Sequence, residues 1–183
     1  MANSAESEEK MARFERLVLP HLDAAYNLAR WMTRNSTDAE DVAQEAMLRA
    51  FRFFDTFRGE DGRVWLLTIV RNTYLTWIRR QMPQQNAAEF DERLHTDIEA
   101  SISPELEVLR QATAEQVRRA IEHLPPEFRE VILMRELEQL SYKEIAAVTQ
   151  TPLGTVMSRL SRGRSMLRQL IARQPKIEVK NHA

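Results

Sequence analysis

The chain has 183 residues, of which 43% are hydrophobic, enough to bury the core of one large or two small domains. It contains no cysteine, which excludes disulfides, cysteine-ligated zinc and thiol catalysis. Glycine is scarce, at 4 residues, and the hairpin dipeptide Asn-Gly does not occur, so we expect an all-α protein. The net charge of -1 is unevenly spread: residues 1–82 hold 12 basic and 12 acidic side chains, residues 83–103 hold 1 and 5, and residues 104–183 hold 13 and 10.

The hydropathy of the chain argues against membrane insertion. The first ten residues, MANSAESEEK, are polar and acidic, unlike a signal peptide. The longest apolar run, residues 64–70, is too short to cross a bilayer. We therefore expect a cytoplasmic protein, and the lack of cysteine fits that compartment.

A first helical domain is predicted over residues 7–82. Apolar side chains recur at helical spacing through residues 8–33, where Pro20 bends the segment or splits it into two helices.

The same domain continues with two more predicted helices. Thr37 followed by Glu40 is a capping-box pattern, which predicts a helix from there to about Phe54. A loop with two glycines, residues 57–62, then leads into residues 63–81, which contain neither glycine nor proline and are too long for a strand.

A linker and a second helical domain follow. Residues 83–103 are polar and acidic and have few large apolar side chains, which predicts a flexible linker. The second domain, residues 104–173, is expected to open with a helix over residues 104–123, to break at a Leu-Pro-Pro sequence and to continue over residues 127–138. A tail of residues 174–183 completes the chain.

Two helices separated by a short turn are predicted near the end of the second domain. Ser141 and Glu144 form a capping box that starts the first helix. Thr151 is the expected cap of the second helix, with Pro152 at its first position.

The second of these helices is basic and amphipathic. It contains five arginines and no acid: Arg159, Arg162, Arg164, Arg168 and Arg173. Its predicted buried stripe is Val156, Leu160, Gly163, Leu167 and Leu170. Its predicted outward residues are Ser158, Ser161, Arg162 and Ser165. The pair of helices is typical of a helix-turn-helix that reads the DNA major groove, and the alternative is an ordinary amphipathic helix with a solvated basic face.

Enzymatic chemistry has no support in the sequence. The chain lacks GxSxG, HExxH and phosphate-loop motifs. The four histidines are scattered without metal-ligand spacing: His21, His95, His123 and His182. We expect no catalytic residue, no metal site and no cofactor.

Three stretches together resemble the extracytoplasmic-function (ECF) sigma factors of bacterial RNA polymerase. Residues 124–167 resemble region 4 of that family almost end to end. Residues 38–54 resemble the helix of region 2 that binds core polymerase, and residues 63–81 resemble the helix after the promoter-melting loop. The resemblance covers about residues 10–172.

The resemblance implies a function for each domain. Region 4 would bind the −35 promoter element through Gly154, Thr155, Ser158, Arg159, Ser161 and Arg162. Arginine suits a bidentate contact with guanine, and the free N–H groups of a helix N-terminus favour phosphate. Two positions depart from the family: Met157 stands where a basic residue is frequent, and Gly163 stands where alanine is usual.

Region 2 would bind polymerase and the −10 element. Acidic and amide residues would meet the basic clamp of the β′ subunit: Asp38, Asp41, Gln44 and Glu45. The residues expected to handle the −10 element are Phe54, Phe57, Arg58, Arg63, Arg71, Asn72, Arg79 and Arg80. The alternatives are a solvated acidic helix start for the first set and core packing for each aromatic.

The sequence thus predicts a sigma factor that directs core polymerase to promoters, including stress promoters, through the β′ clamp, the β flap and promoter DNA. An anti-sigma factor is an expected partner by resemblance. A stand-alone helix-turn-helix regulator is the alternative function, and a pure interaction module is a third.

Overall fold

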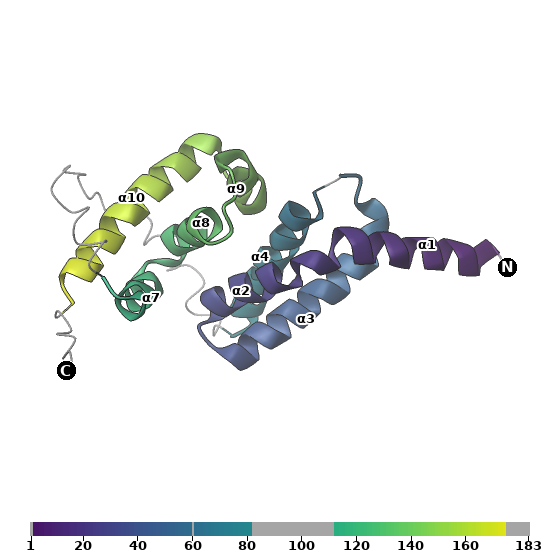
Figure 1. Ribbon diagram of the computed structural model, residues 1–183, viewed down its shortest axis with the longest axis horizontal. Coiled ribbons are helices and arrows are strands. Elements are labelled where there is room, and N and C mark those ends of the chain that lie inside the picture. Colours follow the sequence, from purple (N-terminus) through teal and green to yellow (C-terminus); the bar gives the residue numbers. More distant parts are fainter. Residues whose placement is uncertain (1, 60, 82–111, 175–183) are drawn as a thin grey trace, which may run out of the picture.

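The computed structural model describes residues 2–59, 61–81 and 112–174, and every regular element in these ranges is helical, as predicted (Figure 1). The elements are α1 (Ala2–Leu17), η1 (Leu19–His21), α2 (Leu22–Thr33), α3 (Ser36–Phe53), η2 (Phe54–Thr56), α4 (Gly62–Gln81), α7 (Ala114–His123), α8 (Pro126–Glu136), α9 (Tyr142–Thr149) and α10 (Leu153–Ala172). We call residues 2–81 the N-terminal unit and residues 112–174 the C-terminal unit. The predicted linker, the predicted helix start at residue 104 and almost all of the predicted tail lie outside the described residues. Residues 112–113 are described and are not helical, and Thr113 caps the start of α7. The prediction of one continuous helix over residues 104–123 is therefore wrong at this point.

Helices α2, α3 and α4 pack on one another and form the core of the N-terminal unit. Leu28, Val42 and Leu66, one from each helix, are at most 2% exposed. Pro20 lies in the short 3-10 turn η1, so the predicted split of the first helical segment is confirmed. Proline has no backbone N–H and could not donate the hydrogen bond that a helix interior requires, so the helix breaks at this point.

The cap of α3 differs from the prediction. The helix begins at Ser36, and the side chain of Asn35 accepts hydrogen bonds from the backbone N–H groups of Thr37 (2.8 Å) and Asp38 (3.2 Å). The predicted cap at Thr37 is therefore wrong by two positions. Asparagine is at least as good a cap as threonine, and the extended backbone of Asn35 suits that role.

Gly62 sets the entry into α4. A Cβ atom at this position would lie 1.8 Å from the backbone oxygen of Leu17, at the end of α1. Only glycine allows the loop to pass this close to the preceding helix. The start of α4 is thus fixed against α1.

In the C-terminal unit, α8 caps the end of α7 with a side chain. Arg129 is 3% exposed and donates to the carbonyl oxygens of Ile121 (3.2 Å), Glu122 (3.1 Å) and Leu124 (2.6 Å). These acceptors replace water for a buried guanidinium. Burial lowers the pKa of Arg129 to about 10, so the group remains charged at neutral pH.

Close packing of α10 on α8 depends on Gly163. A Cβ atom there would lie 3.1 Å from Ile132 Cγ1 and 3.4 Å from Phe128 Cβ. Glycine inside a helix costs about 0.5–1 kcal/mol relative to alanine. Here the missing side chain lets the two helices approach, which accounts for the departure from alanine noted in the sequence.

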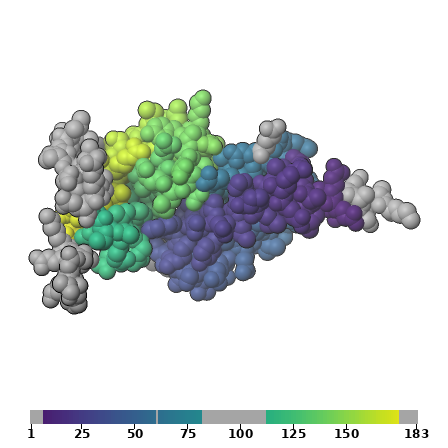
Figure 2. All heavy atoms as spheres, viewed as in Figure 1, coloured from purple at the N-terminus to yellow at the C-terminus, as the bar shows by residue number. Residues whose placement is uncertain are grey.

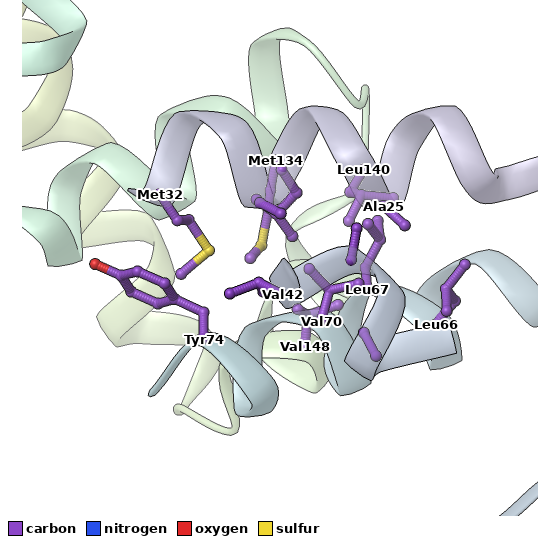
Figure 3. Packing of buried hydrophobic residues seen from close by; sticks show 14 of the residues in the cluster. Ala25, Met32, Val42, Leu66, Leu67, Val70, Tyr74, Met134, Leu140 and Val148 are labelled. Atoms are coloured by element: carbon purple, nitrogen blue, oxygen red, sulfur yellow. The ribbon is translucent and has the colours of Figure 1, made fainter. Parts of the chain in front are cut away.

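The two units pack against each other. Helix α4 contacts α9, and α2 contacts α8, so the space-filling view shows one continuous body (Figures 1 and 2). Buried apolar residues of both units belong to a single cluster, in which Met32 and Tyr74 of the N-terminal unit lie near Met134 of the C-terminal unit (Figure 3). We call this the closed arrangement.

Candidate nucleic-acid and polymerase interfaces

The helix-turn-helix begins with the predicted capping box. Ser141 Oγ accepts from the backbone N–H of Glu144 (3.2 Å), and the Glu144 carboxylate accepts from the backbone N–H of Ser141 (2.6 Å). The bonds from Ser141 lower the pKa of Glu144 below its ordinary value. Gln150 follows the last residue of α9, and its left-handed φ of 54° turns the chain toward α10.

The start of α10 was predicted incorrectly. Pro152 lies one residue before the helix, and no side chain caps the first turn. The hydroxyl of Thr151 is instead hydrogen-bonded to the hydroxyl of Thr149, at 2.7 Å. The turn thus uses Thr151 to link the two helices, and the first N–H groups of α10 have no side-chain cap.

The two faces of α10 largely follow the prediction. Val156, Leu160 and Gly163 are buried against the rest of the C-terminal unit. The exposed residues of the first three turns form one stripe, which we call the outer stripe: Leu153, Gly154, Met157, Ser158, Ser161 and Arg162. Thr155 is half-buried beside it. Ser165, predicted to face outward, is buried, and α10 packs against both α7 and α8. Leu167 and Leu170, predicted to be buried, are half-buried.

The arginines of α10 differ in their partners. Arg159 Nη1 lies 3.6 Å from a carboxylate oxygen of Glu130, and Arg164 Nη2 lies 2.8 Å from Glu136. Arg162 is exposed and has no ion-pair partner among the described residues. Of the two arginines predicted to read DNA, Arg162 is available and Arg159 is engaged within the chain.

The predicted polymerase-binding residues follow one side of α3. They are Asp38, which is half-buried, and Asp41, Gln44 and Glu45, which are exposed. Glu45 accepts a hydrogen bond from Arg49 at 2.7 Å. Leu48 continues the same side and is 64% exposed, an apolar residue that the sequence analysis did not select. The face therefore combines negative charge with an open apolar contact.

The two phenylalanines predicted to stack on −10 bases are core residues. Phe54 is 1% exposed and Phe57 is 5% exposed, and their rings stack on each other with centroids 5.9 Å apart. Arg13 donates to the carbonyl oxygen of Phe57 (3.2 Å) and lies 5.1 Å from the ring centroid of Phe54. In this conformation neither ring is open to a base, so the structure favours the alternative of core packing for both residues. Their rings anchor the loop before α4.

The polar residues predicted for the −10 element fall into two groups. The exposed ones are Arg58, Asn72, Arg79 and Arg80. The engaged ones are Arg63, which donates to the carboxylate and the backbone oxygen of Glu138, and Arg71, which binds Glu130. Both of these acids belong to the C-terminal unit.

Glu130 joins three helices. Its carboxylate accepts from Arg71 Nε (2.7 Å) and Nη2 (3.1 Å) of α4, and it lies 3.6 Å from Arg159 of α10. Its side chain is 6% exposed and that of Arg71 is 14% exposed, so the pair is largely shielded from water. One carboxylate thus neutralises two arginines that the sequence analysis assigned to the two promoter elements.

The sequence analysis did not select Glu130. The sequence signal that could have identified it is an acidic residue directly before the apolar run of residues 131–134. The structure buries the whole stretch Arg129–Met134. A carboxylate in such a run needs a charged partner.

Other kinds of site were searched in the described ranges. No group of histidine, aspartate or glutamate side chains there is arranged to hold a metal ion. None of the helices in those ranges has the length and hydrophobicity needed to cross a membrane.

The fold and these faces define a helical protein of the sigma-70 class. Residues 17–83 match the family described as Sigma-70 region 2, and residues 114–167 match Sigma-70, region 4. The first match covers the N-terminal unit from the end of α1 onward, and the second lies within the C-terminal unit.

Named relatives narrow the class. The chain is 33% identical to the ECF RNA polymerase sigma factor SigE of Mycolicibacterium smegmatis over 165 residues, which is 89% of this chain and 63% of that protein. It is 37% identical to the RNA polymerase sigma-H factor of Pseudomonas aeruginosa, over 84% of this chain and 83% of that one. The ECF sigma-E factor of Escherichia coli K12 is 36% identical over 72% of this chain and 73% of that one. The chain therefore belongs to the ECF sigma factors.

Two solved structures are similar to both units together. The sigma factor RpoE of Bartonella quintana, in complex with the anti-sigma factor NepR, has a TM-score of 0.63 at 26% identity, over 86% of this chain and 95% of that one. CnrH in complex with the cytosolic domain of CnrY has a TM-score of 0.62 at 26% identity, over 90% and 91%.

Proposed function

We propose that the chain is a promoter-specificity subunit of bacterial RNA polymerase, which recruits core enzyme to promoters and performs no chemistry itself. The observation that carries the proposal is the outer stripe of α10, an acid-free exposed surface that contains Arg162, which has no ion-pair partner in the part of the chain that the structure describes. A basic helix positioned by a preceding helix fits the DNA major groove. The protein would act in the cytoplasm, where polymerase and promoter DNA are found.

The C-terminal unit would read the −35 element. Arg162, with Ser158 and Ser161 beside it, would contact base edges. Gly154 and Thr155 would lie against phosphates at the uncapped start of α10. The open surroundings of Gly154 support this assignment, because DNA backbone can approach an open position closely. Apart from the adjoining residues and helix backbone, no heavy atom of the described residues lies within 4 Å of a Cβ built there.

The N-terminal unit would bind core enzyme through the acidic side of α3. Asp38, Asp41, Gln44 and Glu45 would meet basic residues of the β′ clamp, while the C-terminal unit would reach the β flap. Exposed carboxylates steer association with a basic surface. The exposed Leu48 supports an interface here, since it adds apolar area beside the charges.

The −10 element would be handled by α4 and the loop before it. Arg58, Asn72, Arg79 and Arg80 are open to a nucleic-acid backbone in the closed arrangement. Arg63 and Arg71 would join them only after the C-terminal unit moves away, because Glu138 and Glu130 now occupy their guanidinium groups.

The closed arrangement would be the inactive form, held by an anti-sigma factor. One solved relative is a sigma factor in complex with an anti-sigma factor, the other is CnrH in complex with the cytosolic domain of CnrY, and both are similar to this chain over most of its length. Moreover, Arg71 and Arg159 share Glu130, so nucleic acid and this carboxylate compete for the same cations.

Run-off transcription with core polymerase and a promoter library tests the proposal. Wild-type protein should give promoter-dependent transcripts, and Asp41→Lys with Glu45→Lys should reduce assembly with core while leaving the helical circular dichroism signal intact. Glu15→Lys with Asp23→Lys is the matched control, because it makes the same change in charge at exposed positions of α1 and α2. Equal assembly by both double variants would make the acidic side of α3 an ordinary solvated helix face.

The alternative, a stand-alone regulator that uses only the helix-turn-helix, gives a different result. Such a protein would bind duplex DNA without polymerase and would need a dimer on a two-fold symmetric site. Tight, sequence-specific binding by the free chain, with no transcripts on adding core enzyme, would favour it.

A further inference from the structure

The outer stripe of α10 contains two large apolar side chains. Leu153 is 41% exposed and Met157 is 52% exposed, and they lie four residues apart on the same side of the helix. The buried side of α10 is complete without them, since Val156 and Leu160 already fill it. The two exposed side chains therefore serve no core of the C-terminal unit.

A single exposed methionine needs no explanation on an ordinary surface. Met157, however, lies on the surface that enters a major groove under the proposed function. Two polar residues next to it already have partners within the protein. Ser158 donates its hydroxyl hydrogen to the carbonyl oxygen of Thr155 at 3.0 Å, so it offers DNA chiefly an acceptor. Arg159 is drawn toward Glu130. Much of what the stripe offers at this point is thus apolar.

Only one base feature in the major groove is apolar: the 5-methyl group of thymine. Every other base edge presents a donor or an acceptor, which an exposed methionine would leave without a hydrogen-bond partner.

We propose that Met157, supported by Leu153, is a specificity-determining residue that reads a thymine methyl group in the −35 element. This inference rests on the proposed function and adds a second recognised base, a thymine, to the −35 element. Met157 and Arg162 are five residues apart, about 7.5 Å along the helix axis. Both side chains belong to the outer stripe, so the thymine would lie near the guanine that Arg162 would contact.

Replacing thymine by deoxyuridine tests the proposal, because it removes only the methyl group. Holoenzyme, formed from this chain and core polymerase, is first used to select a functional −35 sequence from a promoter library. Each thymine of that sequence is then replaced singly by deoxyuridine, and the affinity of the holoenzyme is measured for each duplex. Burial of one methyl group predicts about a fourfold loss at one position.

Three variants assign the loss to a side chain. Met157→Ala should remove the difference between thymine and deoxyuridine, and Met157→Leu should keep most of it. Leu137→Ala is the matched control, because Leu137 is 49% exposed at the end of α8, outside the outer stripe, and should leave the difference unchanged.

The outcomes separate this proposal from the proposed function. Promoter-dependent transcription without any deoxyuridine effect would overturn the role of Met157 and leave the sigma-factor function standing. An effect of deoxyuridine that persists in Met157→Ala would also overturn it. So would an equal loss of affinity by Met157→Ala on every DNA sequence, which would mean that Met157 contacts protein and not a base. Failure of wild-type holoenzyme to select any promoter would instead reject the proposed function.

Discussion

Replacing Glu130 by glutamine should open the closed arrangement. The change keeps the size of the side chain and removes the charge that binds Arg71 across the two units and faces Arg159 of α10. In the closed form Arg71 would then stay largely buried without a counter-charge, whereas in an open form water would solvate it.

The size of the effect follows from the two hydrogen bonds. Arg71 donates twice to Glu130, at 2.7 and 3.1 Å, and both side chains are largely shielded. Hydrogen bonds to charged groups contribute about 1.5–3 kcal/mol each, against about 0.5–1.5 kcal/mol for neutral ones. Glutamine keeps one acceptor, so we expect a loss of about 2–3 kcal/mol, which shifts the balance of closed and open forms roughly 30- to 150-fold.

Fluorescence transfer between the units measures this shift. Because the chain has no cysteine, Glu15→Cys on α1 and Ala147→Cys on α9 give two unique labelling sites, both exposed. Wild-type protein should show mainly high transfer, and the Glu130→Gln variant should add a population with low transfer. Glu136→Gln is the control, since it breaks an ion pair of the same helix that stays within the C-terminal unit.

Two results would refute this reasoning. One is an unchanged transfer distribution in Glu130→Gln, which would mean that apolar packing alone holds the units together. The other is an equal shift in Glu136→Gln, which would mean that any loss of charge on α8 loosens the protein. A double-mutant cycle with Arg71→Gln gives the coupling between the two residues, and a value near zero would place the effect elsewhere.

Three further changes have definite expected outcomes in urea unfolding followed by circular dichroism. Gly62→Ala should destabilise the N-terminal unit by about 3 kcal/mol or more, because the new Cβ would lie 1.8 Å from the backbone oxygen of Leu17. Gly154→Ala places its Cβ in open space and should not lower the free energy of unfolding. Ser141→Ala should cost about 1 kcal/mol at pH 7 through loss of the cap. Because the pKa of Glu144 is lowered in the folded protein, its carboxylate stabilises the fold at any pH above the ordinary pKa of 4.5. This stability is lost as the pH falls through the lowered pKa. Acid should therefore shrink the difference in stability between Ser141→Ala and wild type.

The helix-turn-helix could be predicted because its signals are local. The reciprocal hydrogen bonds of Ser141 and Glu144 depend on residues three apart, and the buried side of α10 depends on helical spacing, so both can be recognised in the sequence. Cap positions were less certain, since Asn35 and Thr37 are both good caps and the choice between them depended on the path of the chain after α2.

The engagement of Arg71 could not be predicted. Its partner, Glu130, is 59 positions away, and the pairing exists only because α4 and α8 are brought together in the closed arrangement. A guanidinium binds phosphate and carboxylate with the same geometry, so the sequence cannot distinguish a DNA contact from an ion pair. The aromatic residues pose a similar problem, because a ring that stacks on a base and a ring that fills a core have the same composition. Phe54 and Phe57 proved to belong to the core.

The surfaces left open by the closed arrangement constrain how it can be opened. The acidic side of α3 around Asp41 and Glu45 is exposed, so a partner that touched this side alone would bind closed and open forms equally well and would not shift their balance. Opening requires contacts that the closed form lacks, and Arg63 and Arg71 are contacts of that kind because Glu138 and Glu130 occupy them. Nucleic acid that binds these two arginines would replace each carboxylate by a phosphate group. Under the proposed function, promoter DNA on Arg63 and Arg71 would therefore supply the difference in affinity that core enzyme bound to α3 alone would not.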